Sequence, residues 1–292
     1  MAEKKIPFRL KGHEKFVLRD GWLNKGLQAV DNNERIFLED NAPDELGVGN
    51  NMVKSIRYWL KAFKLIHEKP GKGAYLTSFA DAILEYDRYF ENDFTLWILH
   101  SNLVRNIEEA TTWYMFFNRC DAEEFNREEI KDIIVSEIIK YVKHSNFSKL
   151  SVKNDIDVLL NMYCKEKGAD YDPEDKNVCP LSELGLIFKK NDIYVRRQPD
   201  IRKLSEWVIL YELLNIFKDN KSISIDTISQ GERSIGNMYN LSRVTINEYL
   251  DKLENMDFIR VIRTAGLDVV MKETDMTAEK AIDEYYKNHQ MR

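Results

Sequence analysis

The sequence predicts a mainly α-helical protein that carries small β-hairpins, and three observations support this fold class. The 292 residues include only 12 Gly and 6 Pro, too few for the turns of a β-propeller and few for a large β-sandwich. Apolar residues recur at helical spacing over most of the chain. The 14 Phe, 14 Tyr and 5 Trp supply a core and exclude a disordered tail.

The N-terminal residues and the spacing of the cysteines indicate the cellular location of the protein. The start, from Met1 to Lys5, has no signal-peptide core, and no apolar run approaches the ~20 residues that cross a bilayer. Cys120, Cys164 and Cys179 form no CxxC pattern and fit a reducing compartment better than a disulfide framework. We expect a cytoplasmic protein with no membrane partner.

Charge is distributed unevenly along the chain. The formal net charge is −6, yet residues 1–80 hold 14 basic and 10 acidic side chains. A basic stretch on an acidic protein is typical of a face that meets a polyanion, although an ordinary solvated face has the same composition. The bias is strongest in residues 50–72, where Glu68 is the acidic residue among Lys54, Arg57, Lys61, Lys64, Lys69 and Lys72.

The first 64 residues contain two expected long helices with a short one between them. The first long helix is expected from Phe16 to Val30. Pro43 suits the first turn of the short helix, and Gly47 and Gly49 suit the sharp turn that ends it. The second long helix is expected from Asn50 to Lys64.

This second long helix has two different faces. Its apolar face is formed by Val53, Ile56, Leu60 and Phe63, with Trp59 beside them. The opposite face carries an amide, hydroxyls and cations at Asn51, Lys54, Ser55, Tyr58 and Lys61. A helix that buries one stripe and presents hydrogen-bonding groups on the other predicts the reading helix of a helix-turn-helix.

A hairpin and a further helix are expected next. Leu65 to Glu68 suits a strand, Lys69 to Gly73 a tight basic turn, and Ala74 to Thr77 a returning strand. Ser78 is expected to cap a helix from Phe79 to Tyr86. The order helix, helix, hairpin, helix predicts an N-terminal winged helix-turn-helix domain over residues 1–90.

The predicted winged helix suits duplex DNA. Asn and Lys of the reading helix are expected at base edges in the major groove, whereas Arg57 and the lysines of the wing are expected on phosphates. The alternative is a winged helix that contacts protein. The expected DNA-binding residues are Asn50, Asn51, Lys54, Ser55, Arg57, Tyr58, Lys61, Lys69 and Lys72.

Residues 91–200 form the expected helical middle domain. Asp93 to Val104 and Glu109 to Asn118 are dense in aromatic residues, which predicts core helices rather than a base-stacking platform, because no arginines are interleaved. His100 is expected to be a hydrogen-bonded core residue rather than a ligand. Ser151 is expected to cap the next helix.

An acidic loop over residues 168–177 interrupts the middle domain. It lacks the central glycine and closing glutamate of a calcium-binding hand, so a solvated connector is expected. Cys164 and Cys179 have no paired histidine, and we therefore assign no metal site and no catalytic thiol. The acidic residues of the loop are Asp170, Asp172, Glu174 and Asp175.

Residues 201–292 show a second, weaker winged-helix pattern. Leu204 to Phe217 is an amphipathic helix, and Ser242 is expected to cap the helix from Arg243 to Met256. Phe258 to Lys272 is expected to form a hairpin. The expected buried residues of the capped helix are Val244, Tyr249, Leu250, Leu253 and Met256, with Arg243, Thr245 and Asn247 near its start.

Several motifs resemble those of a bacterial protein family. They are Gly12–Phe16, Arg19–Gly26, Leu46–Trp59, Thr95–His100, Ala110–Tyr114, Cys179–Leu186 and, more faintly, Ala265–Leu267. Through them the chain resembles SspB-type proteins, which are encoded beside cysteine desulfurases and PAPS-reductase-like enzymes of DNA phosphorothioation systems. The resemblance spans nearly the whole chain and is most specific from Leu46 to Trp59.

The resemblance implies a role in antiviral DNA modification, in which sulfur replaces a non-bridging phosphate oxygen. It implies double-stranded DNA as a partner, with the cysteine desulfurase and PAPS-reductase-like proteins as further partners. It also implies DNA nicking, which would require Mg²⁺ or Mn²⁺; no other cofactor is expected. Two winged units would let the chain straddle a duplex or pair with itself as a homodimer.

No recognisable motif for strand cleavage accompanies this resemblance. There is no HNH-type or HxH pattern, and no spaced acidic pair is followed by ExK. Catalytic groups would have to be assembled in three dimensions, for example from His13, Glu14 and Arg19 near Lys25. The alternative for His13 and Glu14 is a polar cap on the first helix. The catalytic residues are therefore left unassigned.

Two other functions stay open. A winged-helix transcription regulator would read a two-fold symmetric operator as a dimer and leave the DNA unchanged. An interaction scaffold would bind sulfur-transfer enzymes through the acidic C-terminal two thirds of the chain, and the basic stretch would be incidental.

Overall fold

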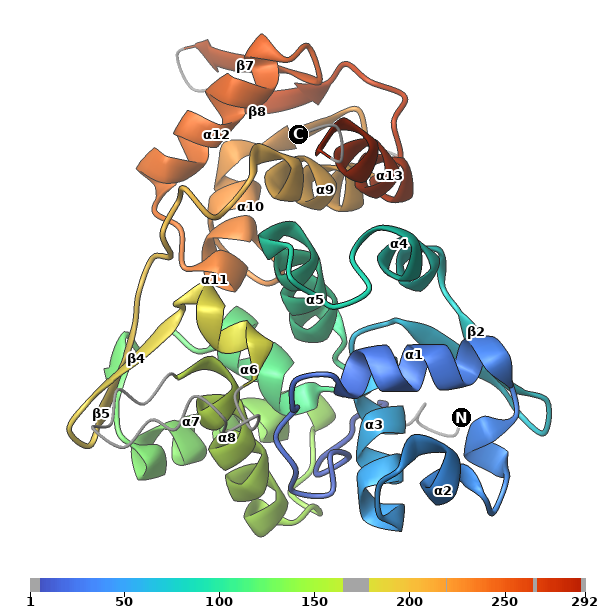
Figure 1. Ribbon diagram of the computed structural model, residues 1–292. Coiled ribbons are helices and arrows are strands. Elements are labelled where there is room, and N and C mark those ends of the chain that lie inside the picture. The colour runs from blue at the N-terminus through green and yellow to red at the C-terminus, as the bar shows by residue number, and fades with distance from the viewer. Residues whose placement is uncertain (1–5, 165–178, 219, 265–266, 290–292) are drawn as a thin grey trace, which may run out of the picture.

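Helices form most of the molecule, and small antiparallel sheets lie among them (Figure 1). The computed structural model describes residues 6–164, 179–218, 220–264 and 267–289. This mainly helical fold with small hairpins confirms the predicted fold class. The acidic loop at 168–177 lies outside the described residues, so its prediction as a connector stays a prediction.

The N-terminal elements follow the predicted order of helices, hairpin and helix. They are α1 (Trp22–Asn32), η1 (Ile36–Leu38), α2 (Ala42–Leu46), α3 (Asn50–Ala62), β1 (Ile66–Lys69), β2 (Gly73–Leu76) and α4 (Ser78–Tyr86). The two strands pair antiparallel, with Ile66 opposite Leu76. The apolar stripe predicted for α3 is buried, from Val53 to Phe63.

Two expected boundaries in this unit were wrong. The first helix begins at Trp22 rather than Phe16, because Gly21 directly before it has a left-handed backbone with φ of 73°. Thr77, rather than Ser78, caps α4, and its hydroxyl accepts a hydrogen bond from the Ala80 N–H.

A backbone contact ties the hairpin to the chain that precedes α2. The N–H of Ala74 donates to the carbonyl oxygen of Glu34 at 2.7 Å. A Cβ on Gly73 would lie 2.3 Å from that oxygen, and Gly73 has φ of +141°. Both facts require glycine at this position of β2.

The middle elements supply the aromatic core. They are α5 (Asp93–Arg105), α6 (Thr111–Arg119), β3 (Glu124–Phe125), α7 (Arg127–Val142), α8 (Lys149–Tyr163), η2 (Pro180–Leu184), β4 (Ile187–Lys190) and β5 (Ile193–Arg196). The strands are ordered β3-β5-β4. Trp97 of α5 and Trp113 of α6 are buried, which confirms these segments as core helices. Ser148, rather than the expected Ser151, caps α8. The Oγ of Ser148 accepts a hydrogen bond from the Ser151 N–H.

His100 is a hydrogen-bonded core residue, as predicted. Its Nε2 lies 2.8 Å from the carbonyl oxygen of Met238 and its Nδ1 lies 2.7 Å from the hydroxyl of Tyr163. Because a carbonyl only accepts, Nε2 carries the proton and Nδ1 accepts from the tyrosine. Burial of the ring lowers the pKa of His100 to about 4.

The C-terminal elements contain the predicted helices and hairpin and add short elements before α12. They are α9 (Glu206–Phe217), β6 (Ser222–Ser224), α10 (Ile225–Ser229), α11 (Ile235–Tyr239), α12 (Arg243–Asn255), β7 (Ile259–Thr264), β8 (Leu267–Lys272) and α13 (Ala278–His289). β6 adds an edge to the hairpin, in the order β6-β8-β7. The Oγ of Ser242 accepts from the Thr245 N–H at 3.2 Å, which confirms this cap.

Two residues expected in the core of α12 are exposed. Val244 is 70% exposed and Met256 is 37% exposed. In the first turn, Thr245 and Ile246 take the buried positions, so Val244 points to solvent.

α3 and α12 end in the same way. Each helix has 13 residues, and each is followed by a left-handed residue, Lys64 with φ of 55° and Asp257 with φ of 59°. After α3 the N–H of Leu65 donates back to the helix, and after α12 the N–H of Phe258 does the same. A hairpin follows in both places, so the two ends of the chain repeat one arrangement.

The final helix joins the two ends of the chain. α13 packs on α9 and also on α4, as Figure 1 shows. The rings of Tyr86 and Tyr286 stack with centroids 5.3 Å apart, and those of Phe94 and Tyr285 with centroids 3.8 Å apart. The hydroxyl of Tyr286 also lies 2.6 Å from that of Thr95. The helices that follow the two hairpins are therefore in direct contact.

The depressed pKa of His100 predicts an acid-sensitive fold. Below the unfolded pKa of 6.5, the unfolded chain binds a proton at this ring that the folded protein takes up only near pH 4. The free energy of unfolding should therefore fall by about 2 kcal/mol between pH 7 and pH 5 from this group. Urea denaturation of wild type and His100→Gln at both pH values measures the difference. Equal pH dependence in the two proteins would contradict the assignment.

Candidate nucleic-acid interface

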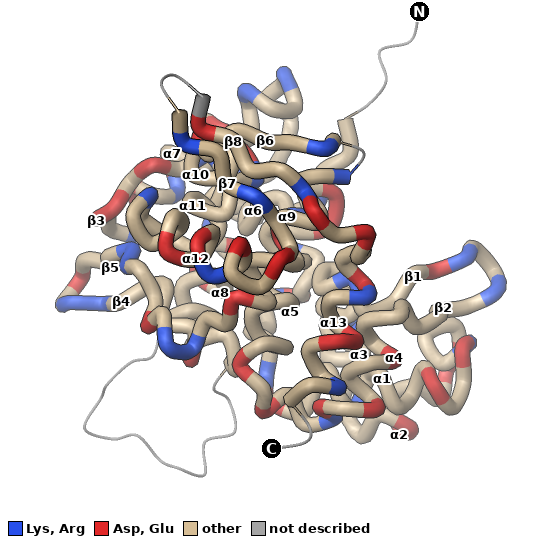
Figure 2. Tube along the Cα trace, turned by 90° about the horizontal axis from the view of Figure 1, so that it is seen from above, with Lys and Arg blue, Asp and Glu red and all other residues tan. Residues whose placement is uncertain are grey.

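The β1–β2 hairpin presents basic residues to solvent. Figure 2 shows it projecting from the body, with basic residues toward its tip. Lys69 and Lys72 are exposed, and neither makes an ion pair with another described residue. Arg35 joins them, since its Nη1 donates to the carbonyl of Gly71 at 3.1 Å. The hairpin is therefore a cationic surface.

The start of α3 is also exposed. A left-handed Gly47 ends α2, and Gly49 lies at the N-terminal boundary of α3. Asn50, Asn51 and Lys54 on the first turns of α3 face solvent. These three predicted residues and the two hairpin lysines are therefore accessible to a ligand.

The predicted polar face of α3 is buried further along the helix, which corrects two of the expected DNA contacts. Ser55 is 0% exposed and Tyr58 is 3% exposed. The guanidinium of Arg9 lies over the Tyr58 ring, 5.2 Å from its centroid. A Cβ on Gly12 would lie 2.4 Å from that ring. The N-terminal segment therefore covers Tyr58 on the side of α3 that was expected to read bases.

We call residues 9–16 the N-terminal strap. Asp155 of α8 fixes it: one carboxylate oxygen lies 2.8 Å from the Lys11 backbone N and 2.8 Å from His13 Nε2, and the other accepts from Thr112 Oγ1 at 2.7 Å. His13 Nδ1 accepts from the Lys15 N–H, so Nε2 donates to the carboxylate. His13 and Asp155 are 0% and 1% exposed. The strap is thus anchored by a buried hydrogen-bond cluster.

This anchor overturns both interpretations of His13. The ring is buried and bonded to Asp155, so it is neither a catalytic group facing solvent nor a cap on α1. Glu14 and Lys25 are exposed, and Arg19 lies over the Trp22 ring at 5.3 Å. No hydrogen bond or ion pair between described residues joins these four predicted candidates to one another.

The face of α12 that corresponds to the buried positions of α3 is open to solvent. The sequence did not predict this difference between the two helices. Glu248 and Asp251, at the positions of Ser55 and Tyr58 in the repeated arrangement, are exposed. The face is not basic, because its arginines are paired. Arg243 pairs with Asp226 and, at 3.2 Å, with Asp268, and Arg263 pairs with Asp251 at 2.7 Å.

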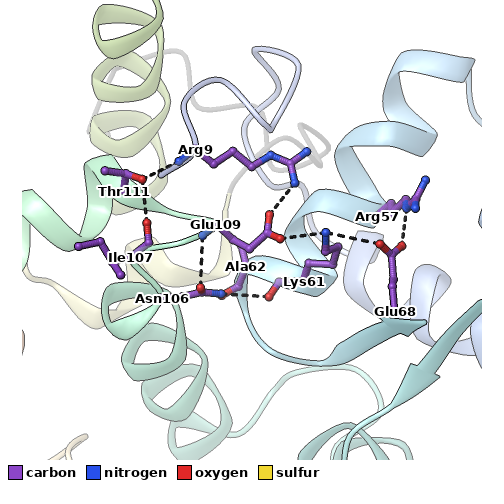
Figure 3. Close-up of polar contacts among 9 residues, drawn as sticks. All are labelled: Arg9, Arg57, Lys61, Ala62, Glu68, Asn106, Ile107, Glu109 and Thr111. Carbon is purple, nitrogen blue, oxygen red and sulfur yellow. Dashed lines mark hydrogen bonds and ion pairs between the residues drawn. The ribbon is translucent and has the colours of Figure 1, made fainter. Parts of the chain in front are cut away.

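An alternating row of charges lies beside α3 (Figure 3). Arg57 Nε donates to Glu68 at 2.5 Å, and the other oxygen of Glu68 lies 3.4 Å from Lys61 Nζ. Lys61 Nζ also lies 2.9 Å from Glu109, which in turn pairs with Arg9 at 2.5 Å. Two of the expected DNA-binding cations, Arg57 and Lys61, are therefore paired with carboxylates. The signal was present in the sequence, since Glu68 lies within the basic stretch.

A groove of about 380 Å³ separates this part of α3 from the hairpin. Burial raises the pKa of the Glu68 carboxyl in this groove, but the hydrogen bond and charge of Arg57 and the charge of Lys61 outweigh it, so the net shift is downward. The carboxylate is therefore ionised at neutral pH. The groove is lined by Glu34, Phe37, Leu38, Arg57, Lys61, Glu68, Lys69, Pro70, Gly71, Gly73 and Ala74.

Other site chemistries find little support in the described part of the chain. No group of three or more His, Cys, Asp or Glu side chains there is arranged to hold a metal ion. Cys179 is buried, which raises the pKa of its thiol to about 12 and keeps it protonated. None of the described helices is both long and apolar enough to cross a bilayer.

A family model described as "Protein of unknown function (DUF4007)" matches residues 10–286. The chain belongs to the DUF4007 family. Two solved structures are similar to this member, one titled "SspB crystal structure" and one titled "Magnesium ion-bound SspB crystal structure". Each is 26% identical, with a TM-score of 0.83 over 97% of this chain and 89% of the other. The SspB-type resemblance inferred from the motifs is confirmed. A search of curated proteins found no match.

Trp59 tests the core assignment of α3. Its ring packs against Trp113 at 5.6 Å and against His13 at 5.9 Å, and it is 0% exposed. Trp59→Ala should lower the free energy of unfolding by about 3–5 kcal/mol, because it empties a core site. Chemical denaturation measures the loss. A variant with wild-type stability that had lost only DNA binding would contradict the assignment.

Proposed function

We propose that this chain is the DNA-binding component of a bacterial DNA phosphorothioation and antiviral defence system. Its likeness to SspB over 97% of its length supports the assignment to that system, because SspB-type proteins are encoded beside sulfur-transfer enzymes. Under the proposal, double-stranded DNA is the ligand. The cysteine desulfurase and PAPS-reductase-like proteins are the partners, and the chain works in the cytoplasm.

In this proposal, the N-terminal elements act as a winged helix. α2, the turn at Gly47 and α3 take the places of the helix-turn-helix, and the β1–β2 hairpin is the wing. The hydrogen bond from Ala74 to Glu34 stands where a third strand would pair in a winged helix. The C-terminal elements, with the sheet order β6-β8-β7 after α12, follow the same plan.

The observation that carries the proposal is a set of exposed lysines that make no ion pair with another described residue. Lys54 lies on α3 and Lys69 and Lys72 lie on the hairpin, and Lys69 lines the groove between these two elements. Ammonium groups on a helix and on the hairpin that follows it suit the phosphates of one duplex backbone, and such contacts give binding that falls as salt rises.

The strap limits how α3 meets the duplex. Because Ser55 and Tyr58 are buried, the exposed polar side chains of α3 are those of its first turns, and Arg57 and Lys61 further along are only partly exposed. Asn50 and Asn51 in these first turns are the residues that reach base edges, where an amide can pair with adenine. Recognition therefore relies more on the backbone than on an extended row of base contacts.

A second candidate function is protein recruitment, which the open face of α12 favours. Val244 there is 70% exposed beside the acidic residues Glu248 and Asp251. DNA would be repelled by this face, whereas a partner protein with basic residues would not.

Replacing the three lysines tests the DNA interface. In the variant with Lys54→Gln, Lys69→Gln and Lys72→Gln, affinity for a duplex should fall, and the slope of log K against log salt should decrease by about 3, at roughly 0.9 per lost phosphate contact. Fluorescence anisotropy over roughly 50 to 200 mM salt measures both the affinity and the slope.

The matched control changes three exposed lysines of the C-terminal part, with Lys218→Gln, Lys280→Gln and Lys287→Gln. It removes the same net charge and should leave the slope unchanged. Equal loss in both variants, or no binding by the wild type at low salt, would contradict the proposal. Supercoiled plasmid incubated with and without Mg²⁺ or Mn²⁺ tests cleavage: metal-dependent open circles would add nicking to the function.

A further inference from the structure

The charge row in Figure 3 is built from segments that are far apart in sequence. Arg9 belongs to the strap, Arg57 and Lys61 to α3, Glu68 to β1, and Glu109 to the turn between α5 and α6. The row alternates in sign along its length. The five side chains are between 20% and 41% exposed, so the row lies at the surface.

The backbone of the row is held without help from the ion pairs. Asn106 Nδ2 donates to the carbonyl oxygens of Lys61 at 3.2 Å and Ala62 at 3.0 Å. The Arg9 N–H donates to Thr111 Oγ1 at 2.8 Å, and Thr111 Oγ1 donates to the Ile107 carbonyl at 2.8 Å. The bases of the cationic side chains therefore stay in place if the carboxylates turn away.

The two carboxylates occupy places that a phosphodiester strand could take. Glu68 and Glu109 lie on either side of one ammonium group, that of Lys61, and each also contacts an arginine. A nucleic-acid strand likewise offers negative groups at short and regular intervals. Exposed ion pairs contribute little to stability, and arginine binds phosphate through charge-assisted hydrogen bonds.

The row also continues into the groove beside the hairpin. Arg57, Lys61 and Glu68 line that groove together with Lys69, whose ammonium is free of ion pairs with described residues. A strand that followed the row would therefore run on to the tip of the hairpin. At the hairpin end of this path, the lysines make no ion pair with a described carboxylate. Along the row itself, the cations are paired with Glu68 and Glu109.

We propose that Arg57, Lys61 and Arg9 form a track for one phosphodiester strand, and that Glu68 and Glu109 occupy this track in the free protein. A bound strand displaces the carboxylates to solvent and takes over their cations. The two glutamates thus set the affinity of the interface, and they keep it weak toward isolated anions. This inference rests on the proposed DNA-binding function and extends it to part of the surface whose cations are paired.

Removing a competing carboxylate should therefore tighten binding. Glu68→Gln should increase affinity for a 20-base-pair duplex about 3- to 10-fold and raise the salt slope by about 1, as one more cation becomes available to phosphate. Glu109→Gln should act in the same direction. Fluorescence anisotropy with the duplex and with a single strand of equal length, at several salt concentrations, measures these changes. A gain with the duplex alone or with both probes supports the track.

The control is Glu279→Gln, which makes the same change in net charge on α13, at an exposed position away from α3. It should leave the salt slope unchanged. Arg57→Gln should abolish the gain when it is added to Glu68→Gln, because the freed cation is then missing. Thermal denaturation verifies that each variant is folded, and Glu109→Gln serves independently if Glu68→Gln is not.

The outcomes separate this inference from the function on which it rests. If the triple lysine variant loses affinity but folded Glu68→Gln and Glu109→Gln bind no more tightly than Glu279→Gln, the track is refuted and the DNA interface stands. If the wild type binds neither probe, the proposed function fails first. An equal gain in all three glutamate variants would show an effect of net charge alone and would also overturn the track.

Discussion

The buried carboxylate of Asp155 is the contact on which the N-terminal half of the molecule depends. It accepts hydrogen bonds from the Lys11 backbone, the His13 ring and the Thr112 hydroxyl, so it joins the strap, α8 and α6 at one point. A buried carboxylate is tolerated only when its acceptors are satisfied, and here three donors do so. The cluster thus holds the strap on both sides of Gly12, the residue that lies against the Tyr58 ring.

That anchor decides which helix faces are open. The strap covers Tyr58 of α3, whereas Asp251, at the equivalent position of α12, stays exposed. The two helices share their length, their termination and their following hairpin, yet they present opposite surfaces. Around α3 the surface is basic at its start and partly neutralised further on, and around α12 the arginines are paired with acids. Shared architecture therefore does not imply a shared ligand.

Local patterns in the sequence were sufficient for much of the fold. The apolar stripe of α3, the β1–β2 hairpin and the Ser242 cap each depend on residues a few positions apart, and all were predicted. The burial of Tyr58 was not, because the strap that lies against its ring is anchored by the hydrogen bond between His13 and Asp155, 142 positions away. No periodicity in α3 encodes that contact. The pairing of Arg57 with Glu68 was accessible from sequence, since an acid within a basic stretch is a candidate partner.

The charge distribution gives the proposed complex a direction. The chain has a net charge of −6, and residues 1–80 are its basic part. Near a duplex, such a molecule turns its basic N-terminal surface toward the phosphates and its acidic remainder away, because the polyanion attracts one and repels the other. The open face of α12 would then point to solvent while DNA is bound. One chain could thus hold DNA with its closed, basic unit and leave its open, acidic unit free for a protein, which is the arrangement that recruitment to DNA requires.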